Sequence, residues 1–102
     1  MKHYRQGDVL LKAIPALPAG ERTKRENGVL AYGEVTGHSH AVADHAAAEV
    51  YELDGGLFLS VTDEGGVSIV HEEHQPITVP KGDYAVTIQR EYSPLEIRNV
   101  AD

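Results

Sequence analysis

The sequence predicts an all-β domain, a small antiparallel barrel or sandwich of seven to eight short strands with a short C-terminal helix. Three observations support this prediction. Apolar and polar residues alternate with a period of two in several segments. Glycine-containing turns separate these segments, and no internal repeat interrupts them. With 102 residues, 41% hydrophobic and 25% charged, residues 1–102 are expected to form a single domain.

The first half of the chain contains two β-rich segments and one irregular segment. "GDVLLKAI" (7–14) and "GVLAYGEVT" (28–36) are rich in strand-forming residues. "PALPAGERTKRENG" (15–28) combines prolines, glycines and charges, so it is predicted to be an exposed loop. "ADHAAAEV" (43–50) is interpreted as a loop or a single turn, since its alanines favour helix and its flanks favour strand.

The second half shows the clearest alternation. In "YAVTIQREY" (84–92), Tyr84, Val86 and Ile88 share one face, and "LFLSVT" and "VSIVH" alternate likewise. "LDGGLF" and "DEGGVS" predict tight hairpin turns, and "VPKGDY" is expected to close "ITV" against "YAV". In the tail, Ser93 is a candidate helix cap with Pro94 after it, which predicts a short helix in 93–102.

Charge and composition exclude several classes of function. The formal net charge of −7 argues against a nucleic-acid partner, which would require a basic face. No apolar run approaches the ~20 residues that span a bilayer. Asp8 and Lys12 interrupt the N-terminal apolar stretch, so we reject a secretion signal and expect a cytoplasmic protein. Without cysteine there is neither a disulfide nor a thiolate metal site.

Four of the six histidines occur in two close pairs. "GHSH" contains His38 and His40, which would share one face of a strand because side chains repeat every two residues. "HEEH" contains His71 and His74, and His71 continues the inward face of the strand before it. Each histidine alone is more simply explained as a hydrogen-bonding or surface residue. Two such pairs in one small domain favour a metal site.

If the two segments are neighbours in a sheet, the four imidazoles can converge on a transition-metal ion. Zinc is the first candidate, and nickel and copper(II) also favour nitrogen ligands. Glu72 or Glu73 could add a carboxylate, which gives a ligand set suited to iron(II), or could orient an imidazole. If His38 and His40 lie on the face opposite His71, the four-histidine site cannot form.

Two resemblances arise at these motifs. "GEVTGHSH" resembles the first motif of the cupins, small β-barrels whose metal is held by a His-x-His pair, a Glu and a later His. Glu49 follows at a looser spacing, and "VPKGDY" is similar to the second motif but has Tyr84 and Ala85 where a histidine is expected. "RQGDVLL", "GEVTGHSHAV", "HEEHQPITVPKGDY" and "QREY" together are similar to short uncharacterised proteins of bacterial and phage genomes. That second likeness implies a compact module and no reaction.

Three functions follow from the sequence. The leading hypothesis is a non-enzymatic β-module whose histidine cluster binds a transition metal for structure or assembly. Assembly here includes the formation of a homo-oligomer. The second is a cupin-like metalloenzyme with an open metal position and Glu72 or Glu73 as general base. The third is a metal-free module that binds a protein partner through a pH-sensitive histidine surface. The sequence leaves open whether the protein is an enzyme.

Overall fold

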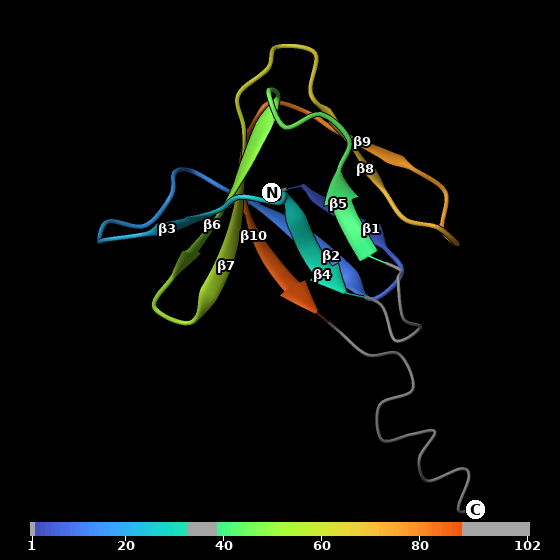
Figure 1. The fold of residues 1–102 in the computed structure, drawn as a ribbon. Helices are drawn as coiled ribbons and strands as arrows, with labels where there is room; N and C mark the ends of the chain where they lie inside the picture. Colours follow the sequence, from blue (N-terminus) through green and yellow to red (C-terminus); the bar gives the residue numbers. More distant parts are fainter. Residues whose placement is uncertain (1, 33–38, 89–102) are drawn as a thin grey trace, which may run out of the picture.

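A computed structural model describes residues 2–32 and 39–88, which form two antiparallel β-sheets (Figure 1). The strands are β1 (His3–Gln6), β2 (Val9–Ile14), β3 (Thr23–Arg25), β4 (Val29–Tyr32), β5 (Ser39–Val42), β6 (Ala48–Leu53), β7 (Gly56–Val61), β8 (Val67–Val70), β9 (Ile77–Val79) and β10 (Gly82–Ile88). One sheet has the order β1-β2-β10-β7-β6-β3, and the other has the order β4-β5-β8-β9.

Two short hairpins build much of the six-stranded sheet. Gly7 has a φ of +62° in the turn between β1 and β2, where Gln6 pairs with Val9. Between β6 and β7, Asp54 and Gly55 both have positive φ, which matches the twist of the flanking strands. The predicted "LDGG" hairpin is therefore confirmed.

Both sheets contribute to one hydrophobic core. Its residues, all buried, are Val9, Leu11, Leu30, Val42, Ala47, Ala48, Val50, Leu59, Val61, Val67, Ile69, Val79 and Tyr84. The predicted alternation is confirmed in β7, where Leu59 and Val61 are buried, and in β8, where Val67 and Ile69 are. Burial of these apolar side chains contributes about 25 cal/mol per Å² of apolar surface removed from water.

The all-β class is confirmed, but of the two predicted architectures, barrel or sandwich, the barrel is wrong, and so is the strand count. Within the described residues neither sheet closes on itself, and there are ten strands where seven to eight were expected. Two strands that the alternation did not indicate are β1 and β3, the outermost strands of the six-stranded sheet. Their sequences, HYRQ and TKR, lack the apolar alternation because an edge strand has little to bury. Residues 15–28, predicted as an exposed loop, are mostly exposed but include β3, which pairs with β6.

Two turns that the sequence assigned to hairpins join the two sheets instead. "DEGG" leads from β7 in the larger sheet to β8 in the smaller one, and "PKG" leads back from β9 to β10. Thus "ITV" pairs with β8 and does not pair with "YAV". The Tyr84 hydroxyl donates a hydrogen bond to the carbonyl of Pro80 at 2.8 Å and so fixes the second crossing. A turn sequence specifies a local reversal, and the strand that follows is chosen by core packing.

The predicted helix in 93–102 lies outside the described residues, as does His38. The described part of the chain consists of strands joined by turns and irregular segments, and it contains no helix that is long and apolar enough to cross a bilayer.

Candidate metal centre

Three of the four predicted histidines meet at one end of the four-stranded sheet. His40 lies on β5, His71 directly follows β8, and His74 lies in the connection from β8 to β9. The ring centroids of His40 and His71 are 4.2 Å apart, those of His71 and His74 4.7 Å, and those of His40 and His74 5.7 Å. One potential ligand atom from each residue lies within 4.8 Å of the others.

The antiparallel pairing of β5 with β8 brings the two histidine motifs together. Ala41 pairs with Val70, so the next residues along the two strands, His40 and His71, lie opposite each other. His40 and Val42 are the two buried residues of β5, and His40 is 2% exposed. His71 is half-buried and His74 is exposed, so the cluster runs from the core to the surface. The condition for a shared site, that the two segments are neighbours in a sheet, is met by the pairing of β5 with β8.

Gln6 on β1 fixes the proton of His40. The Gln6 amide nitrogen donates to the carbonyls of Ile69 and Gln75 at 2.8 and 2.9 Å, which turns its oxygen toward His40. The His40 Nδ1 lies 2.8 Å from that oxygen and therefore donates its proton to it. In the neutral ring the other nitrogen, Nε2, then carries a lone pair. An imidazole held through Nδ1 with Nε2 free is the usual arrangement of a metal-ligating histidine.

The surroundings of His40 keep its ring neutral at pH 7. Burial is the largest cause, and the nearby ring of His71 adds to it, so the pKa of His40 falls from 6.5 to about 4. The carboxylate of Asp8 acts in the opposite direction but is outweighed. A neutral imidazole is the form that binds a metal ion without first losing a proton.

The hairpin turn between β1 and β2 lies against the cluster. The Asp8 Oδ1 is 3.5 Å from the His40 Nε2. A Cβ added to Gly7 would lie 2.5 Å from the His74 Nε2, so the turn backbone approaches that imidazole closely. The turn therefore limits the position of His74 and places a carboxylate beside His40.

His71 is held differently from His40. The backbone N–H of Glu73 donates to the His71 Nδ1 at 3.0 Å, which places the proton of the neutral ring on Nε2. A metal bound at Nδ1 would replace this hydrogen bond directly. A metal bound at Nε2 would move the proton to Nδ1 and break the bond as well. Metal binding at His71 thus entails a small rearrangement of the "HEEH" segment.

Glu72 and Glu73 take part in local structure. The Glu72 Oε1 accepts a hydrogen bond from the backbone N–H of Ser39 at 2.9 Å, which ties the start of β5 to the end of β8. Glu73 contributes its backbone N–H to His71, and both glutamates are exposed. Their role as ligand or general base stays a prediction.

A comparison with known protein families assigns the chain to one of them. One family, described as a domain of unknown function (DUF8820), matches residues 5–89. This chain belongs to that family. No curated protein and no solved structure matches this chain. The matched range of the DUF8820 domain contains both histidine motifs, Gln6 and Asp8. The bacterial and phage origin and the cupin likeness stay predictions.

Gln6, Gly7 and Asp8 were missed as site residues of the DUF8820 domain. They stand in "RQGDVLL", a motif noted for its likeness to other short proteins but given no chemistry. The sequence shows only that these residues form a polar, two-residue turn between strands. Their position in the chain gives no indication that they lie near "GHSH" or "HEEH". Only the packing of the two sheets brings this hairpin to the histidines.

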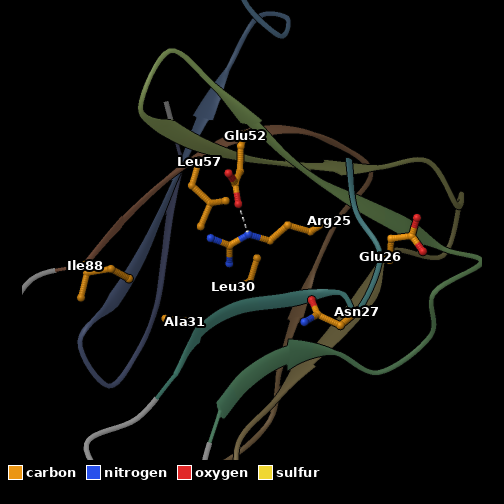
Figure 2. A pocket seen from close by; sticks show the side chains of 8 residues that line it. All are labelled: Arg25, Glu26, Asn27, Leu30, Ala31, Glu52, Leu57 and Ile88. Carbon is orange, nitrogen blue, oxygen red and sulfur yellow. Dashed lines mark hydrogen bonds and ion pairs between the residues drawn. The ribbon is translucent and has the colours of Figure 1, made fainter. Parts of the chain in front are cut away.

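A separate hollow of about 680 Å³ is lined by residues of β4 in the smaller sheet and of β3, β6, β7 and β10 in the larger one (Figure 2). Leu30, Leu57 and Ile88 contribute its apolar wall. Arg25 in this hollow bonds the carboxylate of Glu52 at 2.6 Å and the carbonyl of Val29 at 2.9 Å. These contacts join β3 to β6 and β4, so this polar pair serves the fold. Among residues 2–32 and 39–88, the histidine trio is the group with the spacing of metal ligands.

Proposed function

We propose that this DUF8820 domain binds one transition-metal ion through His40, His71 and His74, with zinc as the first candidate. The observation that carries the proposal is the convergence of three imidazoles, from two separate segments, with potential ligand atoms within 4.8 Å of one another. Nickel, copper and iron are the alternatives, since all accept imidazole nitrogen.

The setting of His40 supports this proposal. Any buried imidazole needs an acceptor for its N–H, and what supports the proposal is that this acceptor takes Nδ1 and leaves the lone pair on Nε2. Here Gln6 is itself oriented by two backbone carbonyls and holds the ring at Nδ1, and the other nitrogen, Nε2, lies 3.5 Å from the Asp8 Oδ1. Removing such an outer partner costs metal sites roughly tenfold to a hundredfold in affinity.

The role that fits the proposal best is structural. His40 is 2% exposed and borders the core, so an ion bound there would stabilise the folded chain over the unfolded one. At a free concentration 100 times the dissociation constant, this linkage amounts to about 2.7 kcal/mol. A metalloenzyme is the second candidate, favoured by the exposure of His74, which leaves the cluster open to solvent on one side.

Elemental analysis of untagged, purified protein tests the proposal. We expect about one metal ion per chain, and zinc titration should show a loss of affinity of tenfold or more in His74→Ala, a variant whose exposed side chain is not needed for folding. His3→Ala is the matched control, because His3 is also exposed but lies on β1 outside the cluster, and its affinity should equal that of the wild type.

The other outcomes separate the alternatives. A ratio of one ion per two chains would indicate a site shared between two copies, and hence a role in assembly. No metal, even after incubation with zinc or nickel, would overturn the proposal and favour a metal-free interaction module. His38→Ala in the same titration tests the remaining predicted ligand.

A further inference from the structure

We infer that Asp8 is a ligand of the same ion, so that the site is closed by a carboxylate from the opposite sheet. This inference rests on the proposed function and adds to it the fourth donor and the purpose of the metal. It is carried by the lone pair on the His40 Nε2, by one distance and by the position of Asp8 in the fold.

Two hydrogen-bond acceptors lie close together at this point. The His40 Nε2 carries a lone pair, because Gln6 takes the proton of the neutral ring at Nδ1. The Asp8 Oδ1, a carboxylate oxygen, lies 3.5 Å from that nitrogen. The His40 side chain is 3% exposed and that of Asp8 is 22% exposed, and the 3.5 Å between the two atoms leaves no room for a water molecule between them. Two lone pairs held together in this way are stabilised by a cation between them.

The distance suits a metal ion. Zinc binds histidine nitrogen and carboxylate oxygen at about 2.0 to 2.2 Å, and a tetrahedral arrangement of such bonds separates neighbouring donor atoms by about 3.4 Å. The observed 3.5 Å between Nε2 and Oδ1 matches this separation. A direct hydrogen bond would be shorter, at about 2.7 to 3.2 Å. The His40 Nε2 and the Asp8 Oδ1 are therefore spaced as two ligands of one ion. Asp8 lies outside the group of three histidines whose ligand atoms are all within 4.8 Å of one another, so side chains of the site must shift for all four to share that ion.

The position of Asp8 explains what a closed site would do. The three histidines belong to the four-stranded sheet and its connections, whereas Asp8 lies in the β1–β2 turn of the six-stranded sheet. The same hairpin already reaches the smaller sheet through Gln6, which bonds Ile69 and Gln75. An ion held by all four residues would bind the two sheets together. Structural zinc sites are closed by four protein ligands, while catalytic sites keep one position for water.

Cobalt(II) substitution tests this inference, because its visible spectrum reports coordination number. We expect four-coordinate bands in the wild type that added azide leaves unchanged. In Asp8→Ala an open position should appear, so azide should alter the spectrum, and zinc affinity should fall tenfold to a hundredfold. Asp8→Asn keeps the shape of the turn and should show the same loss to a smaller degree.

Asp54→Asn is the matched control. It makes the same substitution in the other two-residue hairpin turn, away from the histidines, and should leave spectrum and affinity unchanged. The inference is overturned if Asp8→Ala and Asp8→Asn both behave as the wild type, or if His38→Ala opens the site and the Asp8 variants do not. If the wild type binds no cobalt or zinc at all, the proposed function itself fails, which distinguishes the two results.

Discussion

Gln6 and His40 form a buried polar pair in which each residue determines the state of the other. Both are at most 3% exposed, so neither can rely on water for its hydrogen bonds. Gln6 uses its amide nitrogen twice and its oxygen once, and each of its three partners lies on the smaller sheet or in the connection beyond β8. A buried network that is fully satisfied fixes a single arrangement, and the loss of one member leaves several groups without partners.

Gln6→Ala should destabilise the metal-free protein by about 3 kcal/mol. The substitution leaves the carbonyls of Ile69 and Gln75 and the Nδ1–H of His40 without their partner, and each unsatisfied buried group costs about 1 to 3 kcal/mol. Urea unfolding measures the change. Metal affinity should fall as well, roughly tenfold or more, because the His40 ring is no longer oriented. A stability change below about 1 kcal/mol would show that water replaces Gln6 without cost.

The titration of His40 should make the metal-free protein less stable in mild acid. Burial lowers the pKa of His40 to about 4 in the folded chain, against 6.5 for the free side chain. Between these values the unfolded chain binds a proton that the folded chain does not, so stability falls as the pH drops from 6.5 toward 4. Above pH 6.5 both states are neutral and this contribution is constant.

Urea unfolding of chelator-treated protein across this pH range tests the expectation. His40→Asn is the comparison, because its amide N–H can still donate to Gln6 while the titrating group is gone. The variant should lose less stability between pH 6.5 and 4 than the wild type does. Parallel curves for the two proteins would show that His40 is not the group responsible.

At the scale of elements, the β1–β2 hairpin is the part that completes the site. Its turn contains Gly7 with a positive φ and Asp8 beside His40, and its first strand ends in Gln6. Of these three consecutive residues, Gln6 orients His40, Gly7 approaches His74, and Asp8 supplies the carboxylate beside His40. The hairpin belongs to one sheet by pairing and to the other by its side-chain contacts.

Gly7→Ala should weaken metal binding beyond its effect on stability. The alanine must adopt a left-handed conformation, which costs about 1 to 2 kcal/mol, and its Cβ would lie 2.5 Å from the His74 Nε2, so the imidazole must move. Gly55→Ala is the matched control, since it also has a positive φ but no atom within 4 Å of the added Cβ.

Both glycine variants should lose similar stability by thermal unfolding without metal. Calorimetric titration with zinc should then show reduced affinity for Gly7→Ala alone. Equal affinity in the two variants would contradict the close approach of this turn to His74.

At the scale of the whole molecule, one core serves both sheets. Leu59 from β7 and Ile69 from β8 are each 0% exposed and belong to the same cluster, although their strands lie in different sheets. Neither sheet has a separate interior to retain if the other is lost. The described part of the chain should therefore unfold in a single cooperative transition.

Leu59→Ala and Ile69→Ala should each destabilise the protein by about 3 kcal/mol, within the range for a buried aliphatic side chain. Leu57→Ala is the control, because Leu57 lies on the same strand as Leu59 but is only partly buried, and it should cost less. Circular dichroism and tyrosine fluorescence should report the same transition midpoint in every variant. Two separate midpoints would show that the sheets fold independently.

The sequence by itself determined the class of the fold and the identity of the candidate ligands. Alternation in "LFLSVT" and "VSIVH" requires one buried face per strand, so the β class and many of the core residues could be predicted. In "YAVTIQ" the same pattern predicted Tyr84 correctly, but Ile88 on the same face is 39% exposed. The two histidine pairs could be singled out because metal chemistry depends on residue type and close spacing. Both kinds of inference use interactions between residues near one another in the chain.

Tertiary structure alone decided which segments meet. The turns "DEGG" and "PKG" have the residues of hairpins, yet each leads into the other sheet, because pairing is chosen by how strands share the core. The edge strands β1 and β3 carry little apolar pattern and are recognised only by their partners. Gln6 and Asp8 joined the histidines for the same reason. They are more than 30 residues from His40 in the chain, and only the packing of one sheet on the other brings them within reach.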